Sequence, residues 1–414
     1  MTSFEDCPPS PLDARTKLLT FLPHDFFMYD VIVIGVGSMG AATCYHLASR
    51  GARVLGLEQF SITHDQGSHA GQSRIIRKAY FEHPDYVPLL ARAYDNWCAL
   101  ERETGTQVYY PTGLLYAGPP QGVLMKGVRE SAQQYHIHIE EWTHQQCRDQ
   151  YPAFAIPAHY HLLFEPDAGF LTPERAILLY TERAMHHGAE IHAQEGALSW
   201  GLEGQGVVVQ TPKATYRARK LVLSSGAWTQ QVLPALAGRL KVTRQVIAWV
   251  NPTKDKPVAL GHFPCWLIDR EDGAGMYYGF PQLPVGAFGA PIGLKVALHY
   301  PGEATTPGAV NRTVGQEEEQ ALLQGFQQWL PGIYQSTHAL KTCLYTNTPD
   351  ENFVIDLVVG TEGRVAVAAG FSGHGFKFAS AVGEVLADLA LEGATVQPIG
   401  FLSMQRQALR NFIN

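Results

Sequence analysis

The chain has 414 residues, of which 46 % are hydrophobic and 17 % charged, with 40 glycines and 26 prolines. This composition is typical of a globular protein of two or three domains and excludes a disordered or coiled-coil chain. A net charge of −7 disfavours nucleic-acid binding, and no apolar run reaches the roughly 18 residues that a membrane span needs. The six cysteines are isolated, which argues against a zinc ribbon or a disulfide framework.

Residues 1–27 are expected to form an extension outside the fold. They carry acidic residues and prolines before any apolar stretch, whereas a signal peptide has a positive start and an apolar core. We therefore expect the fold to begin near Met28 and the protein to be cytoplasmic.

The first predicted elements are a buried strand over residues 29–34, a helix over 41–50 and a second strand over 53–57. This order is typical of a βαβ unit in a parallel sheet. An amphipathic helix is predicted over 88–103, because apolar residues recur there at helical spacing and Gly105 follows them.

The middle of the chain has a different pattern. Residues 108–165 contain short aromatic and β-branched runs, and residues 240–300 alternate polar and apolar side chains as antiparallel strands do. Between these regions we predict a helix over 172–188 and a buried strand over 220–224.

The C-terminal part returns to the parallel pattern, with a strand predicted over 364–369 and a helix over 377–391. We therefore predict an α/β fold in which a Rossmann-like dinucleotide-binding domain is interleaved with an antiparallel-sheet (α+β) substrate domain. The predicted boundaries are 28–108, 169–240 and 341–414 for the first domain and 109–168 and 241–340 for the second.

A glycine-rich turn joins the first strand to the first helix. It contains Gly35, Gly37 and Gly40 in a GxGxxG pattern, and Glu58 ends the next strand. Such glycines let a pyrophosphate approach a helix N-terminus, and the acid can bind ribose hydroxyls. A purely structural turn is the alternative. The pattern indicates a dinucleotide but does not distinguish FAD from NAD.

Two arginines, Arg74 and Arg77, lie close together in the next segment. Their spacing would place both on one side of a helix. Guanidinium groups match carboxylates, so the pair could bind an anionic substrate, although surface or phosphate-facing arginines are the alternative. His69, a few residues earlier, is by itself more typical of a structural histidine.

Two further segments carry ionisable residues whose role the pattern leaves open. Lys295 and His299 would lie on the same face of a strand. The pattern alone favours an edge-strand lysine over a functional one. Cys343 could be a small buried hydrophobe, although Lys341 and Tyr345 beside it make that less certain.

Three glycines, Gly370, Gly373 and Gly375, precede the last predicted helix. They would expose backbone N–H groups to an anionic or carbonyl ligand atom. Lys377 opposes the dipole at the start of this helix, so the binding of negative charge explains it better than helix stability.

The chain closely resembles the monomeric sarcosine oxidase family, most densely in the segments GSHAGQSRIIRKAY, CLYTNTPDENFVID and AAGFSGHGFKFAS. The resemblance runs from Tyr29 to about Phe401. It implies a two-domain FAD-dependent oxidase that demethylates secondary (N-methyl) amino acids with O2 and water, giving an amino acid, formaldehyde and hydrogen peroxide.

The family includes oxidases with different substrates, so alternatives remain open. The substrate could be sarcosine, N-methyl-L-tryptophan or a cyclic imino acid such as pipecolate or proline. A flavin dehydrogenase that passes electrons to a carrier is an alternative of a different class. The expected protein is a monomer that binds a small secondary amino acid and O2, with no metal, nucleic acid or membrane partner.

The resemblance also implies roles for single residues. Cys343 matches the cysteine bonded to the flavin 8α-methyl group, for which a nucleophilic thiolate is suited. Lys295 matches the lysine that activates oxygen near flavin N5, where a cation stabilises developing negative charge. Arg77 and Lys377 match the pair that binds the substrate carboxylate, and Arg74 matches the arginine beside the flavin ring. Two cations in one cavity would also lower the pKa of the substrate amine, which must be neutral before oxidation.

Further residues are implied in catalysis and in cofactor binding. Those expected to line the substrate cavity are Tyr278, His299 and Tyr345. Those expected to contact FAD, together with Arg74, Cys343 and Lys377, are Gly35, Gly37, Ser38, Met39, Gly40, Glu58, Gln59, Ser68, His69, Gly226, Trp228, Gly373, His374 and Gly375.

One position departs from the family's pattern. The family commonly has a histidine close to the flavin where this chain has Ala70, and His69 lies one residue earlier. We expect this difference to change the flavin environment or the substrate shape there. The substrate side chain is expected to contact residues 246–266.

Overall fold

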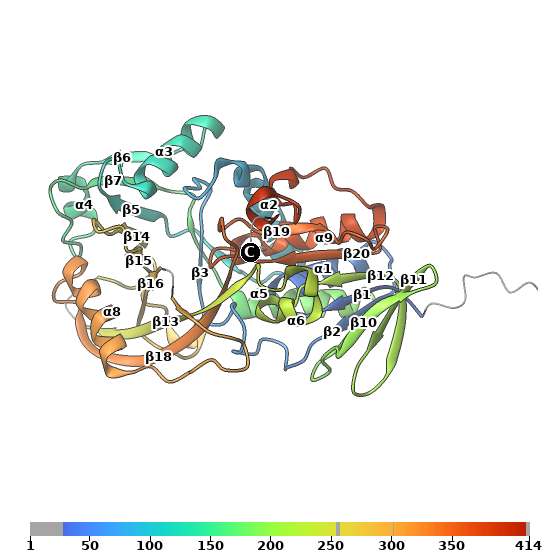
Figure 1. Ribbon diagram of the computed structural model, residues 1–414. Coiled ribbons are helices and arrows are strands. Elements are labelled where there is room, and N and C mark those ends of the chain that lie inside the picture. Colours follow the sequence, from blue (N-terminus) through green and yellow to red (C-terminus); the bar gives the residue numbers. More distant parts are fainter. Residues whose placement is uncertain (1–27, 254–256, 301, 411–414) are drawn as a thin grey trace, which may run out of the picture.

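The computed structural model describes residues 28–253, 257–300 and 302–410, so the predicted extension lies outside it. In Figure 1 two large sheets lie side by side, the eight-stranded one at the right and the nine-stranded one at the left. The predicted α/β fold, with parallel and antiparallel parts interleaved along the chain, is confirmed. The boundaries between the two domains stay a prediction.

The eight-stranded sheet consists of β1 (Tyr29–Ile34), β2 (Val54–Leu57), β9 (Glu190–His192), β10 (Ser199–Glu203), β11 (Gly206–Gln210), β12 (Thr215–Leu223), β19 (Val354–Leu357) and β20 (Val365–Ala369). β1 runs parallel to both β2 and β12, and β12 runs parallel to β20. The strands predicted near the beginning, middle and end of the chain therefore meet in one sheet.

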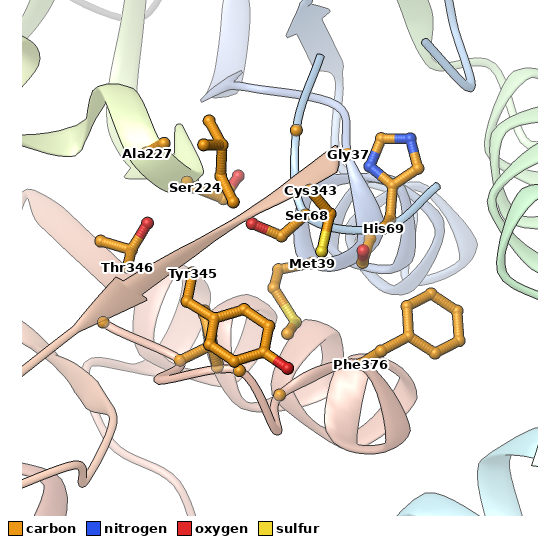
Figure 2. Close-up of a pocket in the computed structure, with 18 of the residues that line it drawn as sticks. Gly37, Met39, Ser68, His69, Ser224, Ala227, Cys343, Tyr345, Thr346 and Phe376 are labelled. Atoms are coloured by element: carbon orange, nitrogen blue, oxygen red, sulfur yellow. The ribbon is translucent and has the colours of Figure 1, made fainter. Parts of the chain in front are cut away.

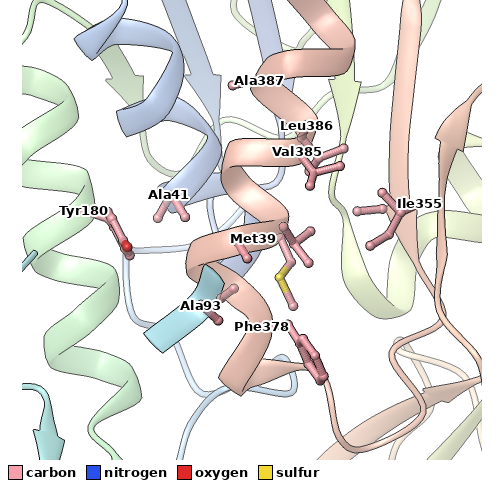
Figure 3. Close-up of a cluster of buried hydrophobic side chains, with 14 of the residues drawn as sticks. Met39, Ala41, Ala93, Tyr180, Ile355, Phe378, Val385, Leu386 and Ala387 are labelled. Atoms are coloured by element: carbon pink, nitrogen blue, oxygen red, sulfur yellow. The ribbon is translucent and has the colours of Figure 1, made fainter. Parts of the chain in front are cut away.

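Four long helices cover one face of this sheet: α1 (Ser38–Ser49), α2 (Val87–Thr104), α5 (Pro173–His186) and α9 (Ala379–Glu392). Figure 3 shows side chains of all four meeting in one apolar cluster. Helices α1 and α9 approach so closely that a Cβ added to Gly383 would lie 2.5 Å from the Cβ of Ala42. This packing fixes the N-terminus of α1 at the end of β1.

The nine-stranded sheet consists of β5 (Leu114–Gly118), β6 (Glu140–Trp142), β7 (His161–Glu165), β13 (Lys241–Pro252), β14 (Cys265–Asp269), β15 (Met276–Gly279), β16 (Leu294–His299), β17 (Glu303–Ala304) and β18 (Tyr334–Asn347). Helix α8 (Gln316–Trp329) packs on one face, through Leu322, Phe326 and their neighbours. Helix α3 (Val123–Tyr135) packs on the same sheet but in a different cluster of buried side chains from α8. The long strand β18 carries the chain back toward the other sheet.

The remaining elements are short. A three-stranded sheet contains β3 (Arg74–Ile76), β4 (Tyr109–Tyr110) and β8 (Gly169–Leu171). Short helices are α4 (His144–Gln150), α6 (Thr229–Val232), α7 (Val285–Phe288) and α10 (Gln407–Arg410). Across the described ranges, no helix has both the length and the apolar character needed to cross a membrane.

Several predicted elements need correction. Helix α1 begins at Ser38 rather than residue 41, because the glycine turn itself enters the first helical turn. Helix α9 begins at Ala379, after a 3₁₀ turn over Phe376–Phe378 that contains Lys377. Helices α3 and α4 lie within the 108–165 region for which only strands were expected.

The environments of three predicted site residues also differ. Arg74 lies in the extended strand β3, so Arg74 and Arg77 do not share a helix face. Lys295 is not an edge-strand lysine, because β16 pairs with β13 on one side and β15 on the other. Its side chain is 2 % exposed.

Candidate active site

A deep cavity lies where the two large sheets meet. Its walls come from the β1–α1 turn, the end of β2, the 64–77 segment, β18 and the 370–377 loop. The empty space is about 1810 Å³ when the open mouth is included. Figure 2 shows Cys343 and Tyr345 projecting from β18 toward the same space as Met39 and Ser68.

The glycine turn is shaped by contacts that exclude larger residues. Gly35 has a φ of 91°, and a Cβ there would lie 2.7 Å from the carbonyl oxygen of Ser224. A Cβ on Gly40 would lie 1.8 Å from the Gly35 oxygen. The backbone N–H of Val36 donates to Glu58 Oε2 at 2.9 Å, and burial raises the pKa of this carboxyl. Glu58 therefore holds the turn and also faces the cavity.

Two polar side-chain atoms in the cavity wall are buried and have no hydrogen-bond partner among the described residues. They are His69 Nε2 and Thr346 Oγ1. Burial lowers the pKa of His69 to about 4, so its ring is neutral. Buried polar groups are normally paired, so these atoms indicate a polar ligand in the cavity. The N-terminus of α1 beside them is a suitable site for phosphate groups.

Arg77 is a buried residue of the cavity wall and already has a carboxylate partner. Its Nη2 donates to Glu82 Oε1 at 2.7 Å and Oε2 at 2.5 Å, and its Nη1 donates to the Ala79 oxygen at 2.8 Å. The guanidinium lies 4.3 Å from the ring centroid of Tyr80 and 4.4 Å from that of Phe81. Arg77 lowers the pKa of Glu82 to about 2 despite burial.

Lys377 reaches the same part of the cavity. Its Nζ donates to the His374 oxygen at 2.8 Å and lies 5.2 Å from the Tyr80 ring centroid. Burial, with the charge of Arg77 as the next cause, lowers the pKa of Lys377 to about 7. The two expected cations thus line one cavity, but Glu82 neutralises Arg77, and the lowered pKa of Lys377 makes it lose its proton more easily than a free lysine.

Tyr80 links the two cations to a buried histidine. Its hydroxyl lies 2.5 Å from His374 Nδ1, and His374 Nε2 lies 3.1 Å from the Glu351 oxygen. Burial lowers the pKa of His374 to about 3, so the ring is neutral. Nε2 then donates to the carbonyl, Nδ1 accepts from Tyr80, and the tyrosine ring is fixed beneath Arg77 and Lys377.

Tyr278, His299 and Tyr345, which the resemblance assigns to the substrate cavity, line this cavity. His299 Nδ1 lies 3.2 Å from the Tyr345 hydroxyl. Burial raises the pKa of Tyr278 to about 12 and lowers that of His299, so both are neutral near pH 7. This group can exchange hydrogen bonds with a ligand without adding charge.

Cys343 and Arg74 lie together in the wall. Arg74 donates to the oxygens of Ser68 at 2.9 Å and Ala70 at 2.6 Å, which fixes its guanidinium in the 68–74 loop. Burial raises the pKa of the Cys343 thiol, while the positive charges of Arg74, Lys295 and Arg312 oppose this effect. The thiol is part of the cavity wall but hardly accessible to solvent, and cationic side chains lie near it.

Lys295 lies behind the wall rather than in it. Its Nζ donates to the Gly71 oxygen at 2.7 Å and the Ser73 oxygen at 2.6 Å. Burial lowers its pKa well below the usual range, and Arg74 adds to this effect. Of the predicted site residues, Gly40 and Lys295 are the two that do not line the cavity.

Several cavity residues were not predicted. Glu82 and Thr346 carry no recognisable pattern in the sequence, because the tertiary fold sets their place in the cavity wall. Leu267 and Met276 form part of the apolar wall. The expected side-chain contacts from 246–266 are wrong for the described residues of that segment, which do not line the cavity. Within the described ranges, no cluster of His, Cys, Asp and Glu could hold a metal ion.

Comparison with known proteins defines the class. The family model of the FAD dependent oxidoreductases matches residues 30–389. The chain therefore belongs to the FAD-dependent oxidoreductase family, and the cavity residues fit its cofactor: a helix N-terminus for the phosphates, Glu58 at the end of β2 and the unpaired atoms of His69 and Thr346.

The chain is similar to particular oxidases over most of its length. It is 39 % identical over 381 residues to a monomeric sarcosine oxidase of Streptomyces avermitilis, which covers 92 % of this chain and 98 % of that protein. It is 33 % identical over 380 residues to an N-methyl-L-tryptophan oxidase of Yersinia pestis, covering 91 % and 99 %. The resemblance predicted from three motifs is confirmed.

Solved structures share the fold. NikD, an amino acid oxidase essential for nikkomycin biosynthesis, superposes with a TM-score of 0.79 at 24 % identity, covering 91 % of this chain and 97 % of that one. L-proline dehydrogenase from P. horikoshii has a TM-score of 0.76 at 22 % identity, covering 92 % and 97 %.

Proposed function

We propose that this protein is an FAD-dependent oxidase of secondary amino acids, with sarcosine or another N-methyl amino acid as substrate and O2 as electron acceptor. The observation that carries the proposal is that Arg77 and Lys377 line the cavity that also contains the glycine turn and lie against the same buried ring, that of Tyr80. The monomeric sarcosine oxidase at 39 % identity supports this substrate class.

The substrate carboxylate would bind between Arg77 and Lys377. Among the residues that the structure describes, Lys377 Nζ donates to one backbone oxygen, so its remaining N–H groups can donate to a carboxylate. A bound carboxylate would in turn favour the protonated form of Lys377. Arg77 would share its donors between Glu82 and the substrate.

The substrate amine must lose its proton, because an ammonium has no lone pair to donate. His299 and Tyr345, which are 3.2 Å apart, could accept and relay that proton. Once held by the glycine turn, Glu58 and the neighbouring cavity residues, FAD would supply the redox chemistry, that is, oxidation of the C–H bond beside the amine and reduction of O2 to hydrogen peroxide. The imine product then hydrolyses, and an N-methyl substrate gives formaldehyde and the free amino acid. Lys295 would stabilise the negative charge that develops on oxygen.

We also propose that Cys343 binds the flavin covalently, since its thiol faces the cavity near Arg74 and Lys295. A thiolate is the reactive form, and the two cations favour it. The names of several relatives support a monomer. The five described cysteines are free, which supports a reducing compartment such as the cytoplasm.

N-methyl-L-tryptophan is the second candidate substrate. The apolar wall made by Leu267, Met276 and Phe81 could hold an aromatic side chain, and the relative at 33 % identity carries that name. A cyclic imino acid such as pipecolate or proline presents the same secondary amine and carboxylate.

Anaerobic bleaching of the flavin tests the substrate class. Sarcosine, N-methyl-L-tryptophan, L-pipecolate and L-proline are mixed separately with the oxidised enzyme, with dimethylamine as the control that lacks a carboxylate. We expect at least one amino acid to bleach the flavin and dimethylamine to leave it oxidised. Bleaching by dimethylamine at the same rate would contradict recognition of the carboxylate.

A further inference from the structure

We propose that Gln72 is a positioning residue for Lys295: it holds the two neighbouring peptide oxygens in the place where they bind the lysine ammonium. The inference deepens the proposed function, because it concerns the lysine assigned to the reaction with O2. It does not depend on which amino acid is the substrate.

The ammonium of Lys295 is held by a short loop that is distant in sequence. Its acceptors are the oxygens of Gly71 and Ser73, at 2.7 and 2.6 Å, which belong to the residues on either side of Gln72. The lysine is almost completely buried, and its hydrogen-bond acceptors are neutral. Because a buried cation depends strongly on its acceptors, the position of this loop decides how well the ammonium is stabilised.

Gln72 has a backbone conformation that needs support. Its φ is 63°, in the left-handed region that residues other than glycine rarely adopt. Turning the chain at Gln72 brings both flanking carbonyls toward the lysine. Strain of this kind persists where surrounding contacts maintain it, and it is concentrated at functional sites.

Both ends of the Gln72 amide supply such contacts. Its Oε1 accepts from Trp249 Nε1 at 2.9 Å. Its Nε2 donates to the oxygens of Gly289 at 3.0 Å and Pro291 at 2.8 Å. The side chain is therefore fixed between the nine-stranded sheet and the loop that leads into β16.

The partner on the sheet is directly linked to Lys295. Trp249 of β13 and Lys295 of β16 are paired in register on adjacent strands, so their side chains leave the same face of the sheet. The indole contacts Gln72 while the ammonium contacts the two peptides beside it. The sheet thus contacts the 71–73 loop through two side chains: Trp249 fixes Gln72, and Lys295 donates to the oxygens of the residues beside it.

Glu174 holds the loop from a third side. Its Oε1 accepts from the backbone N–H groups of Gly71 at 2.7 Å and Gln72 at 3.2 Å. With the N–H groups bound to a carboxylate, the adjoining carbonyls remain available to Lys295. The contacts of Glu174 and of the Gln72 side chain therefore favour the same arrangement, and the oxygens of Ser73 and Gly71 also accept from Arg74 Nη1 at 2.9 Å and from the Ser73 N–H at 2.8 Å.

The variant Q72M tests the proposal, because it keeps the length of the side chain and removes its hydrogen bonds. W249F is a second variant, which removes the indole N–H and leaves Gln72 unchanged. The control is R175A. Arg175 donates to the oxygens of Ala287 at 2.7 Å and Gln107 at 3.1 Å, so this variant removes hydrogen bonds close to the site while the hydrogen bonds of Gln72 remain.

The first measurement is acetylation of each lysine in the purified holoenzyme, followed by peptide mass spectrometry. Exposed Lys341 is the internal reference. We expect Lys295 to react about tenfold faster in Q72M, and somewhat faster in W249F, because local opening exposes it. R175A should leave the ratio of Lys295 to Lys341 unchanged.

The second measurement is the stopped-flow reaction of dithionite-reduced enzyme with O2. We expect Q72M to slow this reaction about tenfold, because a misplaced charge loses much of its effect. Unchanged labelling and unchanged O2 reaction in both Q72M and W249F would overturn the proposal. Equal effects from R175A would also overturn it. Neither measurement requires an amino acid substrate, so failure of the proposed substrate class is a separate outcome.

Discussion

Arg77 and Glu82 form a two-bond ion pair at the wall of the cavity, with Nη2 of the arginine 2.7 Å from one carboxylate oxygen and 2.5 Å from the other. The arginine proposed to bind the substrate carboxylate is thus already neutralised by the protein. A buried pair of this kind loses much if one partner is removed, but it also reduces the net positive charge offered to a ligand.

E82Q tests this compensation. The amide keeps a hydrogen bond to Arg77 and removes the negative charge, so we expect carboxylates such as propionate to bind about threefold to tenfold more tightly at pH 6. The measurement is a spectroscopic titration of the bound flavin. The control is E141Q, which breaks a surface ion pair between Glu141 and Arg129. The Glu141 side chain is 70 % exposed. Weaker propionate binding in E82Q alone would contradict the idea that Glu82 competes with the ligand.

Binding of carboxylates should depend on the protonation of Lys377. Its pKa is lowered to about 7, so the free enzyme loses this charge as the pH rises through 7. A bound carboxylate favours the charged form, and we expect the Kd of propionate to rise about tenfold per pH unit above pH 7. K377R should move this dependence above pH 9. A Kd that is independent of pH between 6 and 9 would contradict the assignment.

The lowered pKa of Lys377 also makes the stability of the folded protein depend on pH. The folded pKa of Lys377 is about 7 and the usual value is 10.5, so the unfolded chain binds more protons between these values. Stability contributed by this site therefore rises with pH through that window and is lowest below pH 7. We expect K377M to raise the Tm at pH 7 by a few degrees while carboxylate binding is lost. A lower Tm would show that burying the lysine is not costly.

The proposed covalent bond between Cys343 and the flavin can be tested by replacing either of two buried cysteines, Cys343 and Cys265. In the parent protein, and in the matched control C265S, acid precipitation should leave the flavin colour with the protein. In C343S the colour should pass into the supernatant. Cys265 is as deeply buried but lies outside the cavity wall. If the flavin of the parent protein is also released, the proposed covalent bond does not exist.

Removing the charge of Lys295 should separate the two half-reactions. K295M is expected to slow the reaction of reduced enzyme with O2 about a hundredfold or more, because a preorganised cation next to developing charge is lost. Reduction by the amino acid should change far less. Stopped-flow absorbance follows each step separately. Equal losses in both steps would argue against the proposed role.

The local parts of this fold could be predicted from the sequence. The strand–turn–helix unit around Gly35 was found because glycine spacing and apolar periodicity act over a few residues. Helix α8 was not predicted, although Leu322, Phe326 and Trp329 recur at helical spacing and would have indicated it. The antiparallel pattern was predicted for residues 240–300 only, and no element was predicted between there and residue 340.

The central contacts of the site could not be predicted in this way. Lys295 binds peptide oxygens more than 200 positions away in sequence, and Glu82 has no neighbouring motif that pairs it with Arg77. The contacts of Lys295 depend on the tertiary fold. The family resemblance implied roles for Lys295 and Arg77 but none for Glu82 or for Gln72, although Gln72 lies within one of the matching segments.

The most direct test of the proposed function is the stoichiometry of products under air. Each secondary amino acid of the panel is incubated with the enzyme, and O2 consumption, hydrogen peroxide and formaldehyde are measured together. For an N-methyl substrate we predict one peroxide and one formaldehyde for each O2 consumed. Reduction of an added dye without peroxide would identify a dehydrogenase instead, and no turnover of any secondary amino acid would contradict the account.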